Sequence, residues 1–276
     1  MLNWVRRALA GRASVRIVEV GAGTGTMVDR LVRWRLVGHG RPATIVAVDE
    51  DGDAIAAAER AYAHRRGALA RAGVAVDFVC STLADVAQRE AGRFDLVVAH
   101  HVLDLLRLDE AVPQAQALAA PGGMFWFTLT FDGRTRWLPP LDRRLDATIE
   151  ARYHASMDER DRTRHSQAGR RLAAAIEAVG GAVAVAGASW WRIVPSATGY
   201  RAGERVVLET ILAFHGAELA GNLPSAQWEW WLRERKAQLA AGRLGLLVRH
   251  RDVAGWFASP STGVQPVSAR SALSSA

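Results

Sequence analysis

The sequence predicts an α/β fold: a doubly wound, mostly parallel sheet of seven strands with helices on both faces. Three observations predict it. Short apolar and β-branched runs alternate with helical patterns along residues 15–130, at the interval typical of a covered parallel sheet. A glycine-rich turn joins the first strand of this series to its helix. Half of the 276 residues are hydrophobic, enough for a full core and against global disorder.

The first repeating unit is predicted to bind a nucleoside. It consists of an apolar run, a glycine turn, a helical pattern and a β-branched run, at residues 17–20, 21–25, 26 to about 36 and 44–48. Glycines at a strand-to-helix turn let the backbone approach a ligand, because they have no Cβ. The following helix points unsatisfied N–H groups at that ligand. Asp49, which closes the second strand, is placed to accept hydrogen bonds from a ribose.

The rest of the chain continues the alternation. Further strands are predicted at residues 74–79, 94–99, 124–130, 182–194 and 244–248. Helices are predicted at residues 2–9, 54–70, 82–89, 105–119, 141 to about 153 and 167–179, with two more between 203 and 241. Pro113 is expected to kink or restart its helix, and residues 121–123 to form a turn.

The residues of the glycine turn resemble a known family motif. A dinucleotide fingerprint, G-x-G-x-x-G, would need its third glycine where this chain has Thr26. The chain instead has E-x-G-x-G-x-G from Glu19 to Gly25, which resembles the first motif of class I S-adenosylmethionine (SAM) dependent methyltransferases. Residues 94–98 and 121–124 also resemble the fourth strand of that family and the turn into the fifth. The resemblance covers residues 15–130, nearly half of the chain.

The resemblance implies a SAM site. By it, Glu19 lies near the methionine ammonium group, the glycines pass under the amino-acid moiety and ribose, and Asp49 holds the ribose hydroxyls. Many family members place an acid after the third strand to bind the adenine amino group. Ser81 and Thr82 occupy that place, so a hydroxyl or a backbone group would substitute. The expected cofactor contacts are Glu19, Gly21, Ala22, Gly23, Gly25, Asp49, Glu50, Ser81, Thr82 and His100.

Two insertions decorate the predicted core, one after strand five (132–165) and one between strands six and seven (203–242). By the resemblance, the last strand runs antiparallel between the fifth and sixth. Ligands of open α/β sheets bind beyond the carboxyl ends of the strands, so the insertions are predicted to form a substrate lid; fold support alone is the alternative. We expect a single domain over residues 1–258 and a flexible tail over 259–276.

Three histidines are the catalytic candidates. Methyl transfer is an in-line displacement that needs a positioned nucleophile and sometimes a base. His100 and His101 follow strand four, with Asp104 close by, and in related methyltransferases this place borders the methyl group. An imidazole there could act as base; alternatively, one of the pair only bonds backbone or Asp104. His154, in the first insertion beside Tyr153, either lines a substrate pocket or is surface.

Other notable side chains have simpler interpretations. Asp142 and Asp146 share a helical face, which favours a solvated face over a metal site, and no metal is predicted. Cys80, the single cysteine, excludes an internal disulfide and is expected to be buried. Core packing is favoured over an aromatic substrate pocket for five tryptophans: Trp190, Trp191, Trp228, Trp230 and Trp231.

Charge and targeting patterns do not favour nucleic acid or membrane. The net charge is +7, from 35 basic and 28 acidic residues, but the arginines are scattered rather than clustered with aromatics. Residues 99–102 do not match the run expected of a nucleic-acid amino-methylase, and Cys80 is misplaced for cytosine C5 methylation. No apolar run has the length of a membrane span and no export segment is recognised, so a cytoplasmic location is expected.

These observations predict a SAM-dependent methyltransferase that acts on oxygen or nitrogen of a small-molecule acceptor. An RNA or protein methyltransferase is one alternative. A non-catalytic SAM-fold scaffold is another, although the intact 19–25 run argues against it. An NAD(P)-dependent oxidoreductase is the third, weakened by Thr26. The acceptor and the oligomeric state are left open.

Overall fold

The computed structural model describes residues 1–38, 40–159, 165–221 and 225–258. Its centre is a seven-stranded sheet with the order β3-β2-β1-β4-β5-β7-β6, which confirms the predicted fold class. β7 pairs antiparallel with both β5 and β6, and the other neighbours are parallel. The strands are β1 (Val15–Val20), β2 (Ala43–Asp49), β3 (Val74–Cys80), β4 (Phe94–His100), β5 (Ala119–Leu138), β6 (Ala182–Ile193) and β7 (Gly245–Trp256).

Helices cover both faces of the sheet. They are α1 (Leu2–Ala8), α2 (Thr26–Arg33), α3 (Gly52–Ala63), α4 (Arg66–Arg71), α5 (Leu83–Arg89), α6 (Leu108–Leu118), α7 (Arg143–Glu159), α8 (Ala168–Ala178), α9 (Glu204–Leu219) and α10 (Ser225–Ala240), with a short 3₁₀ turn, η1, at His165–Gln167. Ile17 of β1 faces an apolar cluster with α1 to α4, while Val18 faces a second cluster with α5, α6 and α8. This alternation is the two-residue period of a strand buried on both faces.

Two local expectations for the first half were wrong. The helix predicted over residues 54–70 is two helices, α3 and α4, because the Arg65 N–H turns back to the Tyr62 carbonyl while its guanidinium bonds Asp29 at 2.5 Å. Cys80 is exposed, not buried, because it ends β3 at the edge of the sheet; its sulfur lies 3.7 Å from the Glu50 carbonyl oxygen.

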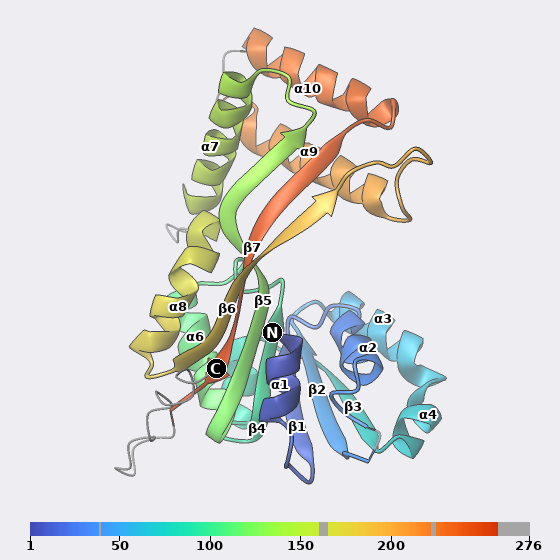
Figure 1. Cartoon of the computed structure of the whole chain (residues 1–276), viewed down its shortest axis with the longest axis vertical. Coiled ribbons are helices and arrows are strands. Elements are labelled where there is room, and N and C mark those ends of the chain that lie inside the picture. Colours follow the sequence, from blue (N-terminus) through green and yellow to red (C-terminus); the bar gives the residue numbers. More distant parts are fainter. Residues whose placement is uncertain (39, 160–164, 222–224, 259–276) are drawn as a thin grey trace, which may run out of the picture.

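Three strands continue beyond the parallel sheet (Figure 1). β5 runs to Leu138, paired with β7 down to Gly245, and β7 pairs in turn with β6 up to Ile193. We call these distal strand ends, with α7, α9 and α10, the upper lobe. It has its own apolar core, whose large members include Trp137, Ile149 and Trp231.

The upper lobe changes the boundaries of the first insertion. Residues 132–138 are strand, so the inserted segment begins after Leu138 and not at residue 132 as expected. The second insertion holds two helices, α9 and α10, as predicted. The predicted tail over 259–276 lies outside the described residues. Within the described ranges, none of the helices has the length and apolar character that crossing a membrane requires.

Two bulges mark where β5 leaves the parallel sheet. The pairing with β7 shifts between Phe127 and Thr130 and again between Phe131 and Arg134. Leu129 has a φ of 56°, and its N–H donates to the Asp252 carboxylate at 2.8 Å. Bulges bend a strand and increase its twist. They therefore redirect β5 next to the carboxyl ends of β1 and β4.

Candidate active site

The glycine turn lies at the carboxyl end of β1. Gly21, Gly23 and Gly25 have φ values of 68°, 51° and 80°, which side chains rarely adopt. A Cβ on Gly21 would lie 2.6 Å from the Val102 side chain, so the loop after β4 packs directly on the turn. A glycine is required at position 21 both for its backbone angle and for this contact.

Asp49 holds the glycine turn in place. One carboxylate oxygen accepts the Gly23 N–H at 2.7 Å, and the other accepts the Asp51 N–H at 3.0 Å. A carboxylate has about four lone-pair sites, so these two bonds leave capacity for further donors. Asp49 can therefore bind ribose hydroxyls while it fixes the loop beneath them.

A cavity of about 240 Å³ opens at this edge of the sheet. Six predicted site residues line it: Gly21, Asp49, Glu50, Ser81, Thr82 and His101. The sequence analysis missed its apolar wall, formed mainly by Leu83, Val102, Leu105 and Leu106. The signal was present, since leucines closely follow the histidine pair. A larger cavity of about 830 Å³ lies by the amino ends of β1 and β2 and along β3, away from the carboxyl edge where parallel sheets bind ligands.

The hydroxyls after β3 are already used. Ser81 Oγ accepts from Arg89 at 2.7 Å and lies 3.3 Å from the Thr82 carbonyl. Thr82 Oγ1 donates to the Asp85 carboxylate at 2.8 Å and accepts the Asp85 N–H at 3.1 Å, capping α5. Of the two possibilities predicted for adenine, the arrangement favours backbone groups over these hydroxyls.

Glu19 is a buried acid without a full set of partners. It is 2% exposed, and its Oε2 has no hydrogen-bond partner. Burial raises the pKa of Glu19 to about 8, against the opposing charge of Arg30 and with the Asp49 charge adding to it. Glu19 does not itself line the 240 Å³ cavity, although its neighbour Val20 does, and its unpaired oxygen is suited to a cationic donor. The unpaired oxygen has the chemistry to accept a hydrogen bond from an ammonium group, and the role that the resemblance assigns to Glu19 stays a prediction.

His100 is held on both ring nitrogens. Its Nε2 lies 2.9 Å from Arg30 Nη1, and its Nδ1 lies 2.6 Å from Thr128 Oγ1. Arginine can only donate, so Nε2 accepts and the proton resides on Nδ1. Burial and the Arg30 charge lower the pKa of His100 to about 4, so the ring is neutral at neutral pH. Sequence reasoning missed both partners, although Arg30 lies only one helical turn after Thr26.

His101 is the histidine of the pair that reaches the cavity. It is exposed, has a φ of 61°, and its N–H donates to the Thr128 carbonyl at 2.9 Å. Its ring meets His250 at 5.6 Å and Trp191 at 6.1 Å, both edge-on. Asp104 is buried with its Oδ1 unpartnered; burial raises the pKa of its carboxyl, and the charge of His101 opposes that rise.

His154 lies apart from the cavity. Its ring packs edge-on against Phe131 at 5.2 Å, and its Nε2 is 4.0 Å from a Glu150 oxygen. Burial lowers the pKa of His154 to about 4. Phe131 and His250 lie between His154 and His101. The structure therefore separates the third candidate base from the other two.

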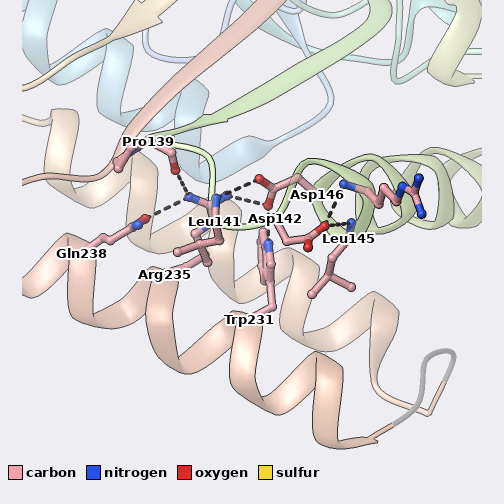
Figure 2. Close-up of polar contacts among 9 residues, drawn as sticks. Pro139, Leu141, Asp142, Leu145, Asp146, Trp231, Arg235 and Gln238 are labelled. Atoms are coloured by element: carbon pink, nitrogen blue, oxygen red, sulfur yellow. Dashed lines mark hydrogen bonds and ion pairs between the residues drawn. The ribbon is translucent and has the colours of Figure 1, made fainter.

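The upper lobe separates the two acids at the start of α7: Asp142, just before the helix, is exposed as expected, whereas Asp146 is partly buried and bonded within the lobe. Asp146 accepts from Trp231 Nε1 at 2.7 Å and from Arg235 at 2.6 Å, while Asp142 accepts two N–H groups at the start of α7 (Figure 2). Arg235 is fully buried and also donates to the Pro139 carbonyl at 2.6 Å. Among described residues, no group of three or more His, Cys, Asp or Glu could hold a metal.

The tryptophans divide between core and surface. Trp228 and Trp231 are buried in the upper-lobe core, in agreement with the favoured interpretation. Trp190 and Trp230 are 42% and 36% exposed. Trp191 is half-buried, packs against the upper-lobe core and touches His101. Only Trp191 of these is therefore in contact with a residue that lines the cavity, among the side chains described.

Sequence comparisons show what the first half of the chain is similar to. Residues 18–125 match the sequence model of a methyltransferase domain family. A ubiquinone biosynthesis O-methyltransferase of Acinetobacter baumannii (strain AYE) is 24% identical over 128 residues, covering 46% of this chain and 48% of the relative. The Escherichia coli O157:H7 protein of the same name is 27% identical over 139 residues, covering 50% and 52%. The chain thus spans about half the length of the curated relatives it matches.

Solved structures extend the similarity over the whole fold. A putative methyltransferase of Bacillus halodurans C-125 aligns with a TM-score of 0.56 and 12% identity, covering 94% of this chain and 99% of that one. The Bacillus subtilis protein YcgJ aligns with a TM-score of 0.52 and 13% identity, covering 94% and 98%. Residues 18–125 are thus similar to a methyltransferase domain, and the seven-stranded fold is the one shared with these structures.

Proposed function

We propose that the chain is a SAM-dependent methyltransferase that transfers a methyl group to oxygen or nitrogen of a small-molecule acceptor. The observation that carries the proposal is the buried, unpaired Glu19 oxygen beside the glycine turn that Asp49 holds. The relatives that match its first half are named for O-methylation in ubiquinone biosynthesis, which supports a small acceptor with a hydroxyl.

The roles of the residues follow from the chemistry. SAM supplies a methyl group on a positively charged sulfur, which a nucleophile displaces in line. The chain has to bind the cofactor, hold the acceptor close and exclude water. Asp49 accepts the ribose hydroxyls, Glu19 accepts the ammonium group, and the wall of Leu105 and Leu106 keeps water from the nucleoside.

His101 is the proposed base. It lines the cavity, and no side-chain hydrogen bond occupies its ring among the residues described. An acceptor hydroxyl would give its proton to a ring nitrogen of His101, and the carboxylate of Asp104 would stabilise the imidazolium that forms. His100 is unsuited to this step, because Arg30 and Thr128 engage both of its nitrogens.

The upper lobe is proposed to bind the acceptor. Trp191 of β6 and His250 of β7 reach the ring of His101 from distal parts of their strands. They bring upper-lobe side chains to the place where an acceptor must meet the base. The inserted segments 139–165 and 203–242 would thus act as substrate-recognition parts.

Calorimetric titration with SAM, S-adenosylhomocysteine and NADH tests the function. We expect the protein to bind both sulfur nucleosides and not NADH. Asp49→Ala should weaken both by about 10-fold or more, because it removes a charged hydrogen-bond acceptor and loosens the Gly23 turn.

Asp53→Ala is the matched control, since Asp53 is exposed on the first turn of α3 and does not line the cavity. NADH binding in place of the sulfur nucleosides would favour the oxidoreductase alternative. Equal losses in the two variants would remove Asp49 from the site.

A further inference from the structure

Arg30 of α2 carries an unneutralised charge at the cofactor edge. Among the residues described, its guanidinium makes one hydrogen bond, to His100 Nε2 at 2.9 Å, and no carboxylate lies within 4.0 Å of it. Arg33, three residues on, is by contrast 76% exposed and paired with Asp29 at 3.5 Å. A half-buried guanidinium with donors to spare is unusual unless an anion completes its environment.

His100 fixes the direction of the Arg30 side chain. Thr128 lies on β5 and is 7% exposed. Its Oγ1 accepts a hydrogen bond from the Nδ1–H of His100 at 2.6 Å, so the His100 Nε2 presents its lone pair to Arg30. This bond occupies one edge of the planar guanidinium and holds the rest in a set orientation. Bidentate binding of a carboxylate requires such a planar, oriented fork.

The nearest acid does not serve as the missing anion. Glu19 is close enough for Arg30 to influence its pKa, and its carboxyl lies against the α2 backbone at Val28. Burial nevertheless holds the pKa of Glu19 at about 8, so near neutral pH it is largely uncharged. The Arg30 guanidinium therefore has donors available for an anion that a ligand brings.

We propose that Arg30 binds the carboxylate of the cofactor's methionine moiety, and that His100, held by Thr128, is the residue that positions it. The inference rests on the proposed function, and it gives the site two complementary parts: Glu19 for the ammonium group and Arg30 for the carboxylate. It also assigns His100 to cofactor binding and leaves His101 as the base.

Two ligands that differ only in this carboxylate test the proposal: SAM and decarboxylated SAM. Wild-type protein should bind SAM about 10- to 100-fold more tightly than decarboxylated SAM, because a charge-assisted bidentate hydrogen-bonded pair contributes a binding free energy of that size. In Arg30→Gln the preference should fall to about threefold or less, through weaker SAM binding, with decarboxylated SAM bound as in wild type. Arg33→Gln, on the same helix, should keep the full preference.

Separate variants test the positioning role of His100. His100→Ala and Thr128→Val should each reduce the preference for SAM partially, by about 3- to 10-fold. His100→Gln should retain more of it than His100→Ala, because a glutamine oxygen can accept the Arg30 hydrogen bond. Circular dichroism and thermal melts confirm that each variant is folded before its binding is compared.

Three outcomes would overturn the inference. One is a preference for SAM that persists in Arg30→Gln; another is equal loss of both ligands in that variant. The third is a His100→Gln variant that binds SAM no better than His100→Ala. If wild-type protein bound neither ligand, the methyltransferase proposal itself would fail, whereas equal binding of both ligands would leave the cofactor assigned and remove only the role of Arg30.

Discussion

Asp146 in the upper lobe and Glu19 at the cofactor edge of the sheet differ in how fully their carboxyl oxygens are hydrogen-bonded. Asp146 in the upper lobe is met by Arg235, Trp231 and the Leu141 N–H (Figure 2). Glu19 at the cofactor edge is more deeply buried, yet one of its oxygens has no partner. Burying a polar group without a partner costs free energy, so such a group persists where a ligand can complete it. Asp146 therefore serves the scaffold, whereas Glu19 keeps an oxygen available for a ligand.

Breaking the satisfied network should produce the largest loss of stability. Asp146→Ala leaves the fully buried Arg235 without its carboxylate, which should lower the free energy of unfolding by about 3–5 kcal/mol. Urea denaturation followed by circular dichroism measures it. Asp142→Ala removes an acid of equal charge four residues earlier, but only a helix cap, and should cost about 1 kcal/mol.

A double variant sharpens this test. Asp146→Leu combined with Arg235→Met removes both charges and should be closer to wild type in stability than Asp146→Ala. If Asp146→Ala were no more destabilising than Asp142→Ala, the network would not hold the upper lobe together.

Removing the unsatisfied acid should stabilise the protein, and more so as pH rises. Glu19 has a pKa of about 8 when folded against an ordinary value of 4.5, so between these values the unfolded chain has lost a proton that the folded chain keeps. Stability from this group therefore falls as pH rises from about 4.5 to 8. Glu19→Gln has no carboxyl group to ionise at this position, so its free energy of unfolding should exceed that of wild type by ~2–4 kcal/mol at pH 8.

Urea titrations of Glu19→Gln and wild type at pH 5, 6.5 and 8 check this expectation. Glu59→Gln, on the exposed face of α3, is the control and should track wild type at each pH. A Glu19→Gln advantage that stayed constant over this range would show that the folded and unfolded pKa values of Glu19 coincide.

The contact beneath the cofactor cavity gives a smaller effect. Gly21→Ala forces a Cβ to within 2.6 Å of Val102, at a φ of 68°, and should lower stability by about 1–3 kcal/mol more than Gly92→Ala. Gly92 has a φ of 69° but nothing within 4 Å, so it reports the backbone cost alone. Thermal and urea melts measure both.

Relief of the clash completes this comparison. Val102→Ala in the Gly21→Ala background should recover part of the difference from Gly92→Ala, because it removes the two Val102 methyl groups that would lie 2.6 and 3.0 Å from the added Cβ, while the 2.6 Å contact with the Val102 Cβ stays. Equal losses at positions 21 and 92, without recovery, would mean that the loop after β4 can move away from the turn.

The parallel half of the fold could be predicted because its strands carry unbroken apolar runs that alternate regularly with helices. The prediction for the upper lobe was wrong where its strands contain charged residues. Residues 132–138 contain Asp132, Arg134 and Arg136, which suggested an insertion, whereas they continue β5 and pair with residues more than 100 positions later. Asp132 lies 3.5 Å from Arg249 and 3.8 Å from Arg251 of β7, so the charges balance only in three dimensions.

Site residues that belong to a sequence motif could be predicted, whereas site residues that stand alone in the sequence could not. Asp49 and the glycines follow from their spacing, and the histidine pair from its place after strand four. The different surroundings of His100 and His101 could not be predicted, because they depend on β4 ending at His100 and on the positive φ of 61° at His101. Arg30 and Thr128, which decide the matter, are distant in sequence and belong to no pattern.

The continuity of β5 has a mechanical consequence. At ~3.3 Å per residue, its 20 residues extend about 65 Å, and its hydrogen bonds to β7 continue on both sides of the bulges. Swinging the upper lobe as a hinged body would require breaking that ladder, which makes this junction stiff. The cavity wall after β4 is held differently: Leu105 is 70% exposed there, and among the described residues only a few backbone hydrogen bonds restrain that short segment.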